Sequence, residues 1–308
     1  MGNVLRIGTR GSRLARRQTG QVAEALRAAQ ADLDIHIETV RTTGDRDRAT
    51  PLARLPGVGF FVKELEQALA AGRIDLAVHS LKDVPTRVAD GLTVATAVPV
   101  RADPRDALLT PEGVDLADLP AGATVGTSSP RRQAMLLAAR PDLAMADLRG
   151  NVDTRLRKLA DGLCDATVLA MAGLARLAVE DARAVPLPAE TVVPAAGQGA
   201  LGLEYRAGDE AVRRCIAAVD HVPTRLAVTA ERAVLLRLGA GCRTPIGVLG
   251  RVGDDGGLHL EAYLLSPDGR QWLRRSVEGD ATDAQALGRG LAEAMLADGA
   301  GNLMAQEA

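Results

Sequence analysis

Aromatic residues and cysteines are scarce in this sequence. Phe, Tyr and Trp together make up 2% of the 308 residues, and the three cysteines, Cys164, Cys215 and Cys242, stand far apart. So few scattered cysteines exclude a disulfide-stapled domain, and none has the CxxC spacing of a zinc site. The four histidines are equally dispersed. We therefore expect no metal site, and cores built from aliphatic side chains.

Long apolar runs and an excess of either charge are also missing. No segment approaches the roughly 20 apolar residues that span a bilayer, and the first residues lack a secretory hydrophobic region. The formal net charge is −2 and the charged fraction is 25%, which gives no reason to expect nucleic acid or an anionic membrane as the partner. The sequence predicts a cytoplasmic protein without nucleic-acid or membrane partners.

The first part of the chain alternates strand and helix signals. Predicted strands cover residues 4–9, 35–39 and 74–78, and Leu14, Gln18, Val22 and Leu26 recur at helical spacing after the first of them. Strands separated by helices of this length predict a mainly parallel sheet. Ligands of such sheets bind beyond the carboxyl ends of the strands.

The same pattern restarts after a proline- and charge-rich stretch, 98–106, which we interpret as a linker. The chain crosses between these two regions a second time near 191–199, which leads to another strand. From residue 223 a long helix, three strands and a closing helix follow. At this length two or three domains are expected. The predicted fold is α/β, with two domains like those of periplasmic binding proteins around a cleft and a smaller α+β C-terminal domain. The expected boundaries are 1–99 with 200–217, 103–193, and 222–308.

One strand-to-helix junction has the features of an anion site. In the sequence GTSSPRR (126–132), Ser128 or Ser129 can cap the helix and Pro130 suits its first position. Free backbone N–H groups at such a helix start attract anions, and the paired Arg131 and Arg132 add forked donors for carboxylate or phosphate. The alternative is a well-capped helix with solvated arginines.

Similar junctions occur at TRGS (9–12) and RGNVDTR (149–155), and Arg176 follows the next predicted strand. Carboxyl ends of parallel strands open on the same edge of a sheet. We therefore expect a cleft between the first two domains that is lined with cationic and hydroxyl side chains, namely Arg10, Ser12, Arg131, Arg132, Arg149 and Arg155.

Two single residues complete the candidate site. Asp83 follows the strand at 74–78, and a carboxylate among cations stays ionised and can stabilise a developing cation, although a loop salt bridge is the plainer interpretation. Cys242 lies in the glycine-rich turn GAGCRTP (239–245), where Arg243 favours the thiolate. A lone cysteine is more often an inert packing residue.

Taken in order along the chain, these segments resemble the porphobilinogen deaminase (hydroxymethylbilane synthase) family. The matching stretches are LRIGTR (5–10), FVKEL (61–65), AVHSLKDVP (77–85), DPRDA (103–107), residues 125–133, LRGN (148–151), GQGA (197–200), TAER (229–232) and Gly241 with Cys242.

The resemblance implies a transferase of tetrapyrrole (haem and porphyrin) biosynthesis. Members join four porphobilinogen molecules head to tail with loss of ammonia and release linear hydroxymethylbilane by hydrolysis. It implies a dipyrromethane cofactor attached to Cys242 through a thioether, and Asp83 as the catalytic carboxylate. A monomer is the simpler expectation.

The other site residues follow from the same resemblance. Those implied to hold the cofactor are Lys82, Asp83, Ser129, Arg131 and Arg132. Those implied to hold the substrate or growing chain are Arg10, Ser12, Thr127, Arg149, Arg155, Arg176 and Gln198. One departure is Val58, in the lid-like loop at 52–61, where relatives commonly have a lysine.

Two other classes remain open at this point. Two α/β lobes joined by two crossings also suit a non-catalytic solute-binding clamp for a small anion, although such a protein needs no reactive cysteine and is usually exported. A transferase acting on a phosphate ligand could use the Ser/Arg junctions, but the chain has no GxxxxGK[ST] loop.

Overall fold

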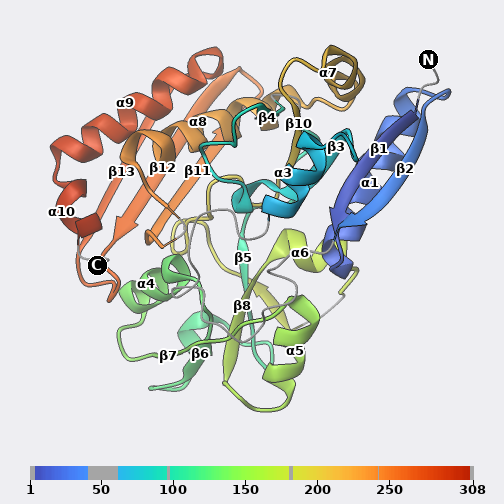
Figure 1. Cartoon of the computed structure of the whole chain (residues 1–308). Coiled ribbons are helices and arrows are strands. Elements are labelled where there is room, and N and C mark those ends of the chain that lie inside the picture. Colours follow the sequence, from blue (N-terminus) through green and yellow to red (C-terminus); the bar gives the residue numbers. More distant parts are fainter. Residues whose placement is uncertain (1–3, 41–61, 96–97, 180–182, 242, 306–308) are drawn as a thin grey trace. The chain divides into compact units, whose positions relative to one another are not determined.

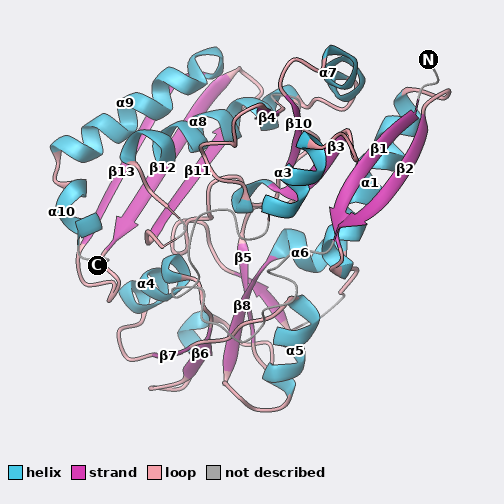
Figure 2. Cartoon of the chain, in the orientation of Figure 1, coloured by secondary structure: helices cyan, strands magenta, loops and turns pink. Residues whose placement is uncertain are grey.

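The computed structural model describes residues 4–40, 62–95, 98–179, 183–241 and 243–305. Two compact units divide the chain: Met1–Ala102 with Ala200–Arg225, and Asp103–Gly199 with Leu226–Ala308. Helices and strands alternate through most of the sequence (Figures 1 and 2). Among the described helices, none combines the length and the hydrophobicity needed to cross a membrane.

The first unit contains a five-stranded mixed sheet with the order β2-β1-β3-β10-β4. Its strands are β1 (Val4–Arg10), β2 (Asp34–Val40), β3 (Leu76–Ser80), β4 (Leu92–Val94) and β10 (Leu201–Arg206). β1 runs parallel to β2 and β3, whereas β10 is antiparallel to β3 and β4. The carboxyl ends of β1 and β3 therefore meet at one edge of the sheet.

Helix α1 (Arg13–Ala29) packs against β1 and β3 (Figure 1). It begins at Ser12 because the Ser12 hydroxyl accepts a hydrogen bond from the backbone N–H of Ala15, at 3.2 Å. The predicted helical stripe is confirmed at Gln18, Val22 and Leu26, which are buried, whereas Leu14 is only half-buried. The unit also contains α3 (Lys63–Ala70) and α7 (Glu210–Ala217), and a short 3-10 helix (Leu81–Asp83) follows β3.

The first sheet of the second unit has an equivalent order, β7-β6-β8-β5-β9. Its strands are β5 (Asp106–Leu109), β6 (Thr124–Gly126), β7 (Ala144–Ala146), β8 (Ala166–Ala170) and β9 (Ala184–Pro186). Its helices are α4 (Pro130–Ala139), α5 (Val152–Ala160) and α6 (Met171–Arg176). The linker predicted at 98–106 is wrong at its end, because Asp106 is fully buried and opens β5, which pairs with β8 and β9.

The second sheet of this unit is antiparallel and has the order β11-β12-β13. Its elements are β11 (Ile246–Val252), β12 (Gly257–Leu265), β13 (Trp272–Asp280), α8 (Val222–Leu238), α9 (Ala284–Ala297) and α10 (Ala300–Met304). On one face, Val248 and Leu264 join a core with α8 and α9. On the other face, Leu249 and Leu265 share a core with Met135 and Val193.

This shared core joins two of the three predicted domains in one compact unit. The predicted α/β fold class, with a smaller C-terminal α+β part, is confirmed. The exact three-domain boundaries and the cleft stay predictions.

A buried carboxylate ties α8 to the second crossing and to the C-terminal sheet. Glu231 is fully buried, and its two oxygens accept hydrogen bonds from the backbone N–H groups of Gly197, at 2.6 Å, and Gly250, at 2.8 Å. Gly197 lies on the second crossing and Gly250 on β11. Glu231 thus fixes the crossing segment to the C-terminal sheet.

We expect Glu231→Ala to lower the free energy of unfolding by about 3 kcal/mol, because two buried N–H groups lose their acceptor and a cavity replaces the side chain. Urea unfolding of the parent and variant chains measures this. The matched control is Glu293→Ala on α9, where the side chain is 53% exposed and pairs with Arg237, so a change under about 0.5 kcal/mol is expected. Equal midpoints for all three chains would contradict the role assigned to Glu231.

Candidate active site

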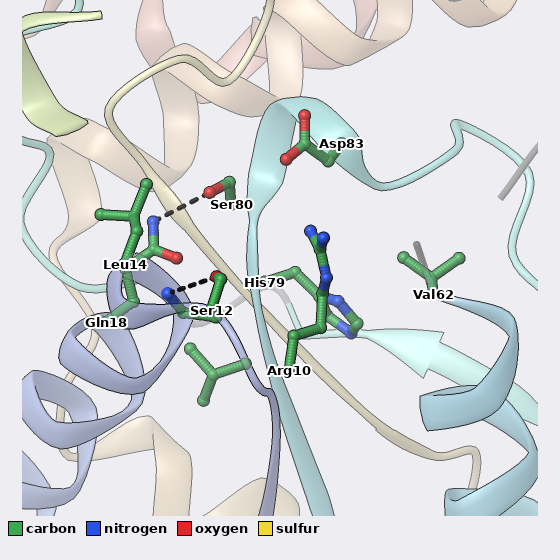
Figure 3. A pocket seen from close by; sticks show the side chains of 10 residues that line it. Arg10, Ser12, Leu14, Gln18, Val62, His79, Ser80 and Asp83 are labelled. Atoms are coloured by element: carbon green, nitrogen blue, oxygen red, sulfur yellow. Dashed lines mark hydrogen bonds between the residues drawn. The ribbon is translucent and has the colours of Figure 1, made fainter. Parts of the chain in front are cut away.

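A pocket opens in the first unit where β1 and β3 end and α1 begins (Figure 3). Its polar lining consists of Arg10, Ser12, Gln18, His79, Ser80 and Asp83. Of the predicted site residues, Arg10, Ser12 and Asp83 line this one pocket.

Arg10 and Asp83 give the pocket one cation and one anion. Arg10 is the last residue of β1 and is half-buried, whereas Asp83 ends the 3-10 helix and is exposed. In Figure 3 the guanidinium of Arg10 extends toward the Asp83 carboxylate. A guanidinium suits a ligand carboxylate, and a carboxylate suits a cationic or N–H group. The pocket can therefore bind a molecule that carries both.

Two polar pairs border this pocket, one part-buried and one buried. Gln18 donates from Nε2 to the Ser80 hydroxyl at 2.8 Å. His79 Nε2 lies 2.9 Å from Glu204 Oε2, with side chains 3% and 1% exposed. No role was predicted for His79, Ser80 or Glu204, although the first two lie inside the HSLKD motif (79–83).

In the second unit, the predicted capping of α4 is confirmed, and Ser129 is the cap. Its hydroxyl accepts from the backbone N–H of Arg132 at 3.5 Å, and Pro130 takes the first helical position. Thr127 is fully buried, and its hydroxyl accepts from the N–H of Ser129 at 3.2 Å. No acidic residue lies in the first turn of α4, so nothing there offsets the positive end of the helix dipole.

The start of α5 forms the second junction of this unit. Asn151 caps the helix by accepting from the Thr154 N–H at 3.0 Å. Arg155 donates from Nε to the carbonyl oxygen of Gly150 at 2.9 Å. Arg149 is half-buried, and its Nη1 atom is buried without a hydrogen-bond partner among the described residues. An unpartnered buried guanidinium nitrogen is a donor available to an anion.

The other predicted arginines of this unit, Arg131, Arg132 and Arg176, are buried inside it. Arg131 and Arg132 are both buried and pair with the carboxylate of Asp106. Arg176 is also buried and donates from Nη2 to the carbonyl oxygen of Gly199 at 2.6 Å. Burial lowers the Arg176 pKa to about 10, so this side chain remains cationic near neutral pH.

Predicted site residues thus gather in separate places. Arg10, Ser12 and Asp83 share a pocket in the first unit, and Lys82 precedes Asp83 in the 3-10 helix. Three side chains, those of Arg131, Arg132 and Gln198, converge on Asp106 in the second unit. Asp106 was missed as a site residue because it falls in the stretch interpreted as a linker. Cys242 and Val58 lie outside the described residues.

The backbone turns sharply in the residues that precede Cys242. α8 ends at Leu238 because Gly239 adopts a left-handed φ of 70°, and Ala240 donates back to the carbonyl oxygen of Leu235 at 3.0 Å. Gly241 is exposed, with open space where a side chain would start, and its N–H donates to the Thr244 hydroxyl at 3.1 Å. The residues that flank Cys242 therefore sit on an open surface turn between α8 and β11.

The donor set fits a ligand with several carboxylates. Two arginines, Arg131 and Arg132, share the single buried carboxylate of Asp106. The guanidinium nitrogens Nε of Arg132 and Nη1 of Arg149 are buried without partners among the described residues. Two helix starts add backbone N–H groups. A dipyrromethane carrying acetate and propionate arms is such a ligand.

Comparison with known proteins gives consistent matches over the chain. A family model described as "Porphobilinogen deaminase, dipyromethane cofactor binding domain" matches residues 5–214, and "Porphobilinogen deaminase, C-terminal domain" matches residues 225–297.

Curated relatives named "Porphobilinogen deaminase" cover almost the whole chain. The protein of Roseiflexus castenholzii is 49% identical over 306 residues, which cover 99% of this chain and 100% of the relative. That of Thermus thermophilus is 48% identical, covering 98% and 99%, and that of Brevibacillus brevis is 46% identical, covering 98% and 96%. Among solved structures, the periplasmic VFT2 domain of BvgS from Bordetella pertussis aligns with 70% of this chain and 86% of its own, at 15% identity and a TM-score of 0.42.

Proposed function

The chain belongs to the porphobilinogen deaminase family, and from this membership we propose that Asp83 is its catalytic carboxylate and Cys242 its cofactor anchor. The chain is a transferase that condenses four porphobilinogen molecules, releases ammonia at each addition and liberates hydroxymethylbilane by hydrolysis. Its cofactor is a dipyrromethane.

The observation that carries the assignment of Asp83 is its place beside Arg10 in one pocket at the ends of β1 and β3. Porphobilinogen has carboxylate arms, a pyrrole N–H and an aminomethyl group. Arg10 binds a carboxylate arm, and the Ser12 hydroxyl, whose oxygen already caps α1, donates its proton to the same arm. Asp83 then faces the ring.

Asp83 acts on charge that develops during the reaction. When the protonated amine leaves as ammonia, the pyrrole becomes a delocalised cation, and the Asp83 carboxylate stabilises it and accepts the pyrrole N–H hydrogen bond. Arg10 lines the same pocket, and Lys82 precedes Asp83 in the 3-10 helix. The dipyrromethane, when bound, supplies the pyrrole carbon at which the chain of rings is extended.

The second unit holds the carboxylate arms of the cofactor and growing chain. Ser129, Arg131 and Arg132 at the start of α4 hold cofactor arms, together with Lys82 of the first unit. Residues that hold the chain or incoming substrate are Thr127, Arg149, Arg155 and Arg176. Gln198 serves the same ligands indirectly, because its amide N–H groups donate to Asp106 and to the Pro104 carbonyl oxygen. The charge balance of the arginines and the two capped helix starts support these roles.

We further propose that the chain works as a monomer in the cytoplasm. The thiols of Cys164 and Cys215 are free, as expected in a reducing compartment. Porphobilinogen is the partner. The non-catalytic anion clamp and the phosphate-ligand transferase have no support from the family membership.

The test is the denatured intact mass of the purified chain, followed by incubation with porphobilinogen. We expect a mass above that of the bare sequence by two deaminated porphobilinogen units, and stoichiometric release of ammonia with a linear tetrapyrrole product. A bare mass that does not change after incubation, with no ammonia released, would refute the proposed function and favour the clamp.

A further inference from the structure

One carboxylate organises the paired arginines of the second unit. Asp106, at the start of β5, has 0% exposure. Its Oδ2 atom accepts from Nη2 of Arg131 at 2.7 Å, and its Oδ1 atom accepts from Nη2 of Arg132, also at 2.7 Å. A single carboxylate therefore holds two guanidinium groups side by side.

Backbone carbonyl groups fix the other arm of each guanidinium. Arg131 donates from Nη1 to the Val193 oxygen at 2.7 Å, and Arg132 donates from Nη1 to the Val168 oxygen at 2.8 Å. Both arginine side chains are only 6% exposed. With two anchor points each, the planar groups have little freedom to rotate.

The charges of this cluster do not cancel. Arg131 and Arg132 bring two positive charges, and Asp106 is the only carboxylate with which they pair in the part of the chain that the structure describes. Burial and the neighbouring Arg132 lower the pKa of Arg131, while Asp106 raises it. Nε of Arg132 is buried without a hydrogen-bond partner among the described residues. One positive charge and one donor are left for an external anion.

The second crossing supplies a neutral third contact. Gln198 is fully buried, and its Nε2 donates to Asp106 Oδ1 at 2.9 Å and to the Pro104 carbonyl oxygen at 2.7 Å. Positive φ angles of 74° at Gly197 and 87° at Gly199 turn the backbone on either side. This amide is occupied within the protein, so Gln198 acts on the arginines through Asp106.

We propose that Asp106 is a positioning residue that holds Arg131 and Arg132 as a rigid receptor with one surplus positive charge for a carboxylate of the dipyrromethane. This inference rests on the proposed function. Asp106 needs no contact with the ligand. Its carboxylate offsets the repulsion between two adjacent guanidinium groups and sets their spacing before the ligand arrives.

The experiment measures cofactor uptake by chains produced in cells that make no porphobilinogen. Each apo chain is incubated with porphobilinogen, and its denatured mass is followed with time. In Asp106→Asn one acceptor oxygen remains, but the negative charge and the second acceptor oxygen are lost, and an NH₂ group faces one of the arginines. Uptake is therefore expected to slow by about tenfold or more. In the double variant Asp106→Asn with Gln198→Glu, the glutamate at position 198 places a carboxylate next to position 106, because Gln198 contacts Asp106 in the parent chain. Uptake is expected to recover to within about threefold of the parent chain.

Thermal unfolding of the same apo chains separates positioning from general stability. Uptake by Asp106→Asn at the parent rate, in a chain that is folded, would overturn the inference. The inference would also be overturned if the double variant took up the cofactor as slowly as Asp106→Asn while its unfolding midpoint equalled that of the parent chain. If Asp106→Asn does not fold, Asp106→Glu decides, because it keeps the charge but moves the carboxylate by one C–C bond. Slowed uptake with an unchanged midpoint supports positioning, and parent-like uptake contradicts it.

Failure of this inference can be distinguished from failure of the proposed function. If the parent chain gains no mass from porphobilinogen, the proposed function fails. If the parent chain gains mass and every Asp106 variant gains it equally fast, only the positioning role of Asp106 fails.

Discussion

A chain carrying Asp83→Ala is expected to fold and to bind porphobilinogen, but to form product about a thousandfold more slowly than the parent chain. The folded state is preserved because Asp83 is exposed and lies outside the hydrophobic cores. The rate falls because the carboxylate that faces the developing cation is gone. Arg10 and Lys82 then add positive charge to a site where a cation must form, which raises the barrier further.

Initial rates of ammonia release, measured on fully loaded chains, test this prediction. Asp83→Asn keeps the shape of the side chain and removes only its charge, so a similar loss is expected. The matched control is Asp90→Ala, because Asp90 is also an exposed aspartate of the first unit and has no assigned role. Turnover by Asp83→Ala within tenfold of the parent chain would remove Asp83 from the mechanism.

The Cys242→Ser chain is expected to have the denatured mass of its bare sequence and no turnover. A thiolate is a far better nucleophile than a serine hydroxyl at neutral pH, because its pKa is much lower. The open turn at Gly239 and Gly241 gives the ligand access to this part of the chain.

The matched control is Cys215→Ser. Burial raises the pKa of the Cys215 thiol, so we expect no covalent ligand there and the full excess mass in the Cys215→Ser chain. Excess mass retained by Cys242→Ser, or lost from Cys215→Ser, would show that the thioether forms at another cysteine.

Local patterns in the sequence were enough to predict most helices and the parallel strands. The spacing of Gln18, Val22 and Leu26 depends only on residues one or two helical turns apart, and it corresponds to the buried face of α1. By contrast, β5 and β4 are short and pair with strands distant in the sequence. Such pairing has no local signature, so Asp106 was grouped with the linker that precedes it.

The candidate site was predictable where strand ends determine position. Arg10 and Asp83 follow adjacent parallel strands, and the sheet rule alone brings them to one edge. The partner of Arg131 and Arg132 was not predictable, since Asp106 lies 25 and 26 residues earlier in the chain. The sequence motif identifies the arginines expected at an anion site, but it does not reveal which carboxylate they contact.

The place of β10 between β3 and β4 affects the order in which the chain can fold during synthesis. On the ribosome, the first hundred residues can assemble β2, β1 and β3, but the outer edge of β3 stays unpaired until residues 201–206 emerge. All five strands of the next α/β sheet lie between Asp106 and Pro186. That sheet can therefore close first, and the part of the protein that is translated earliest is completed later.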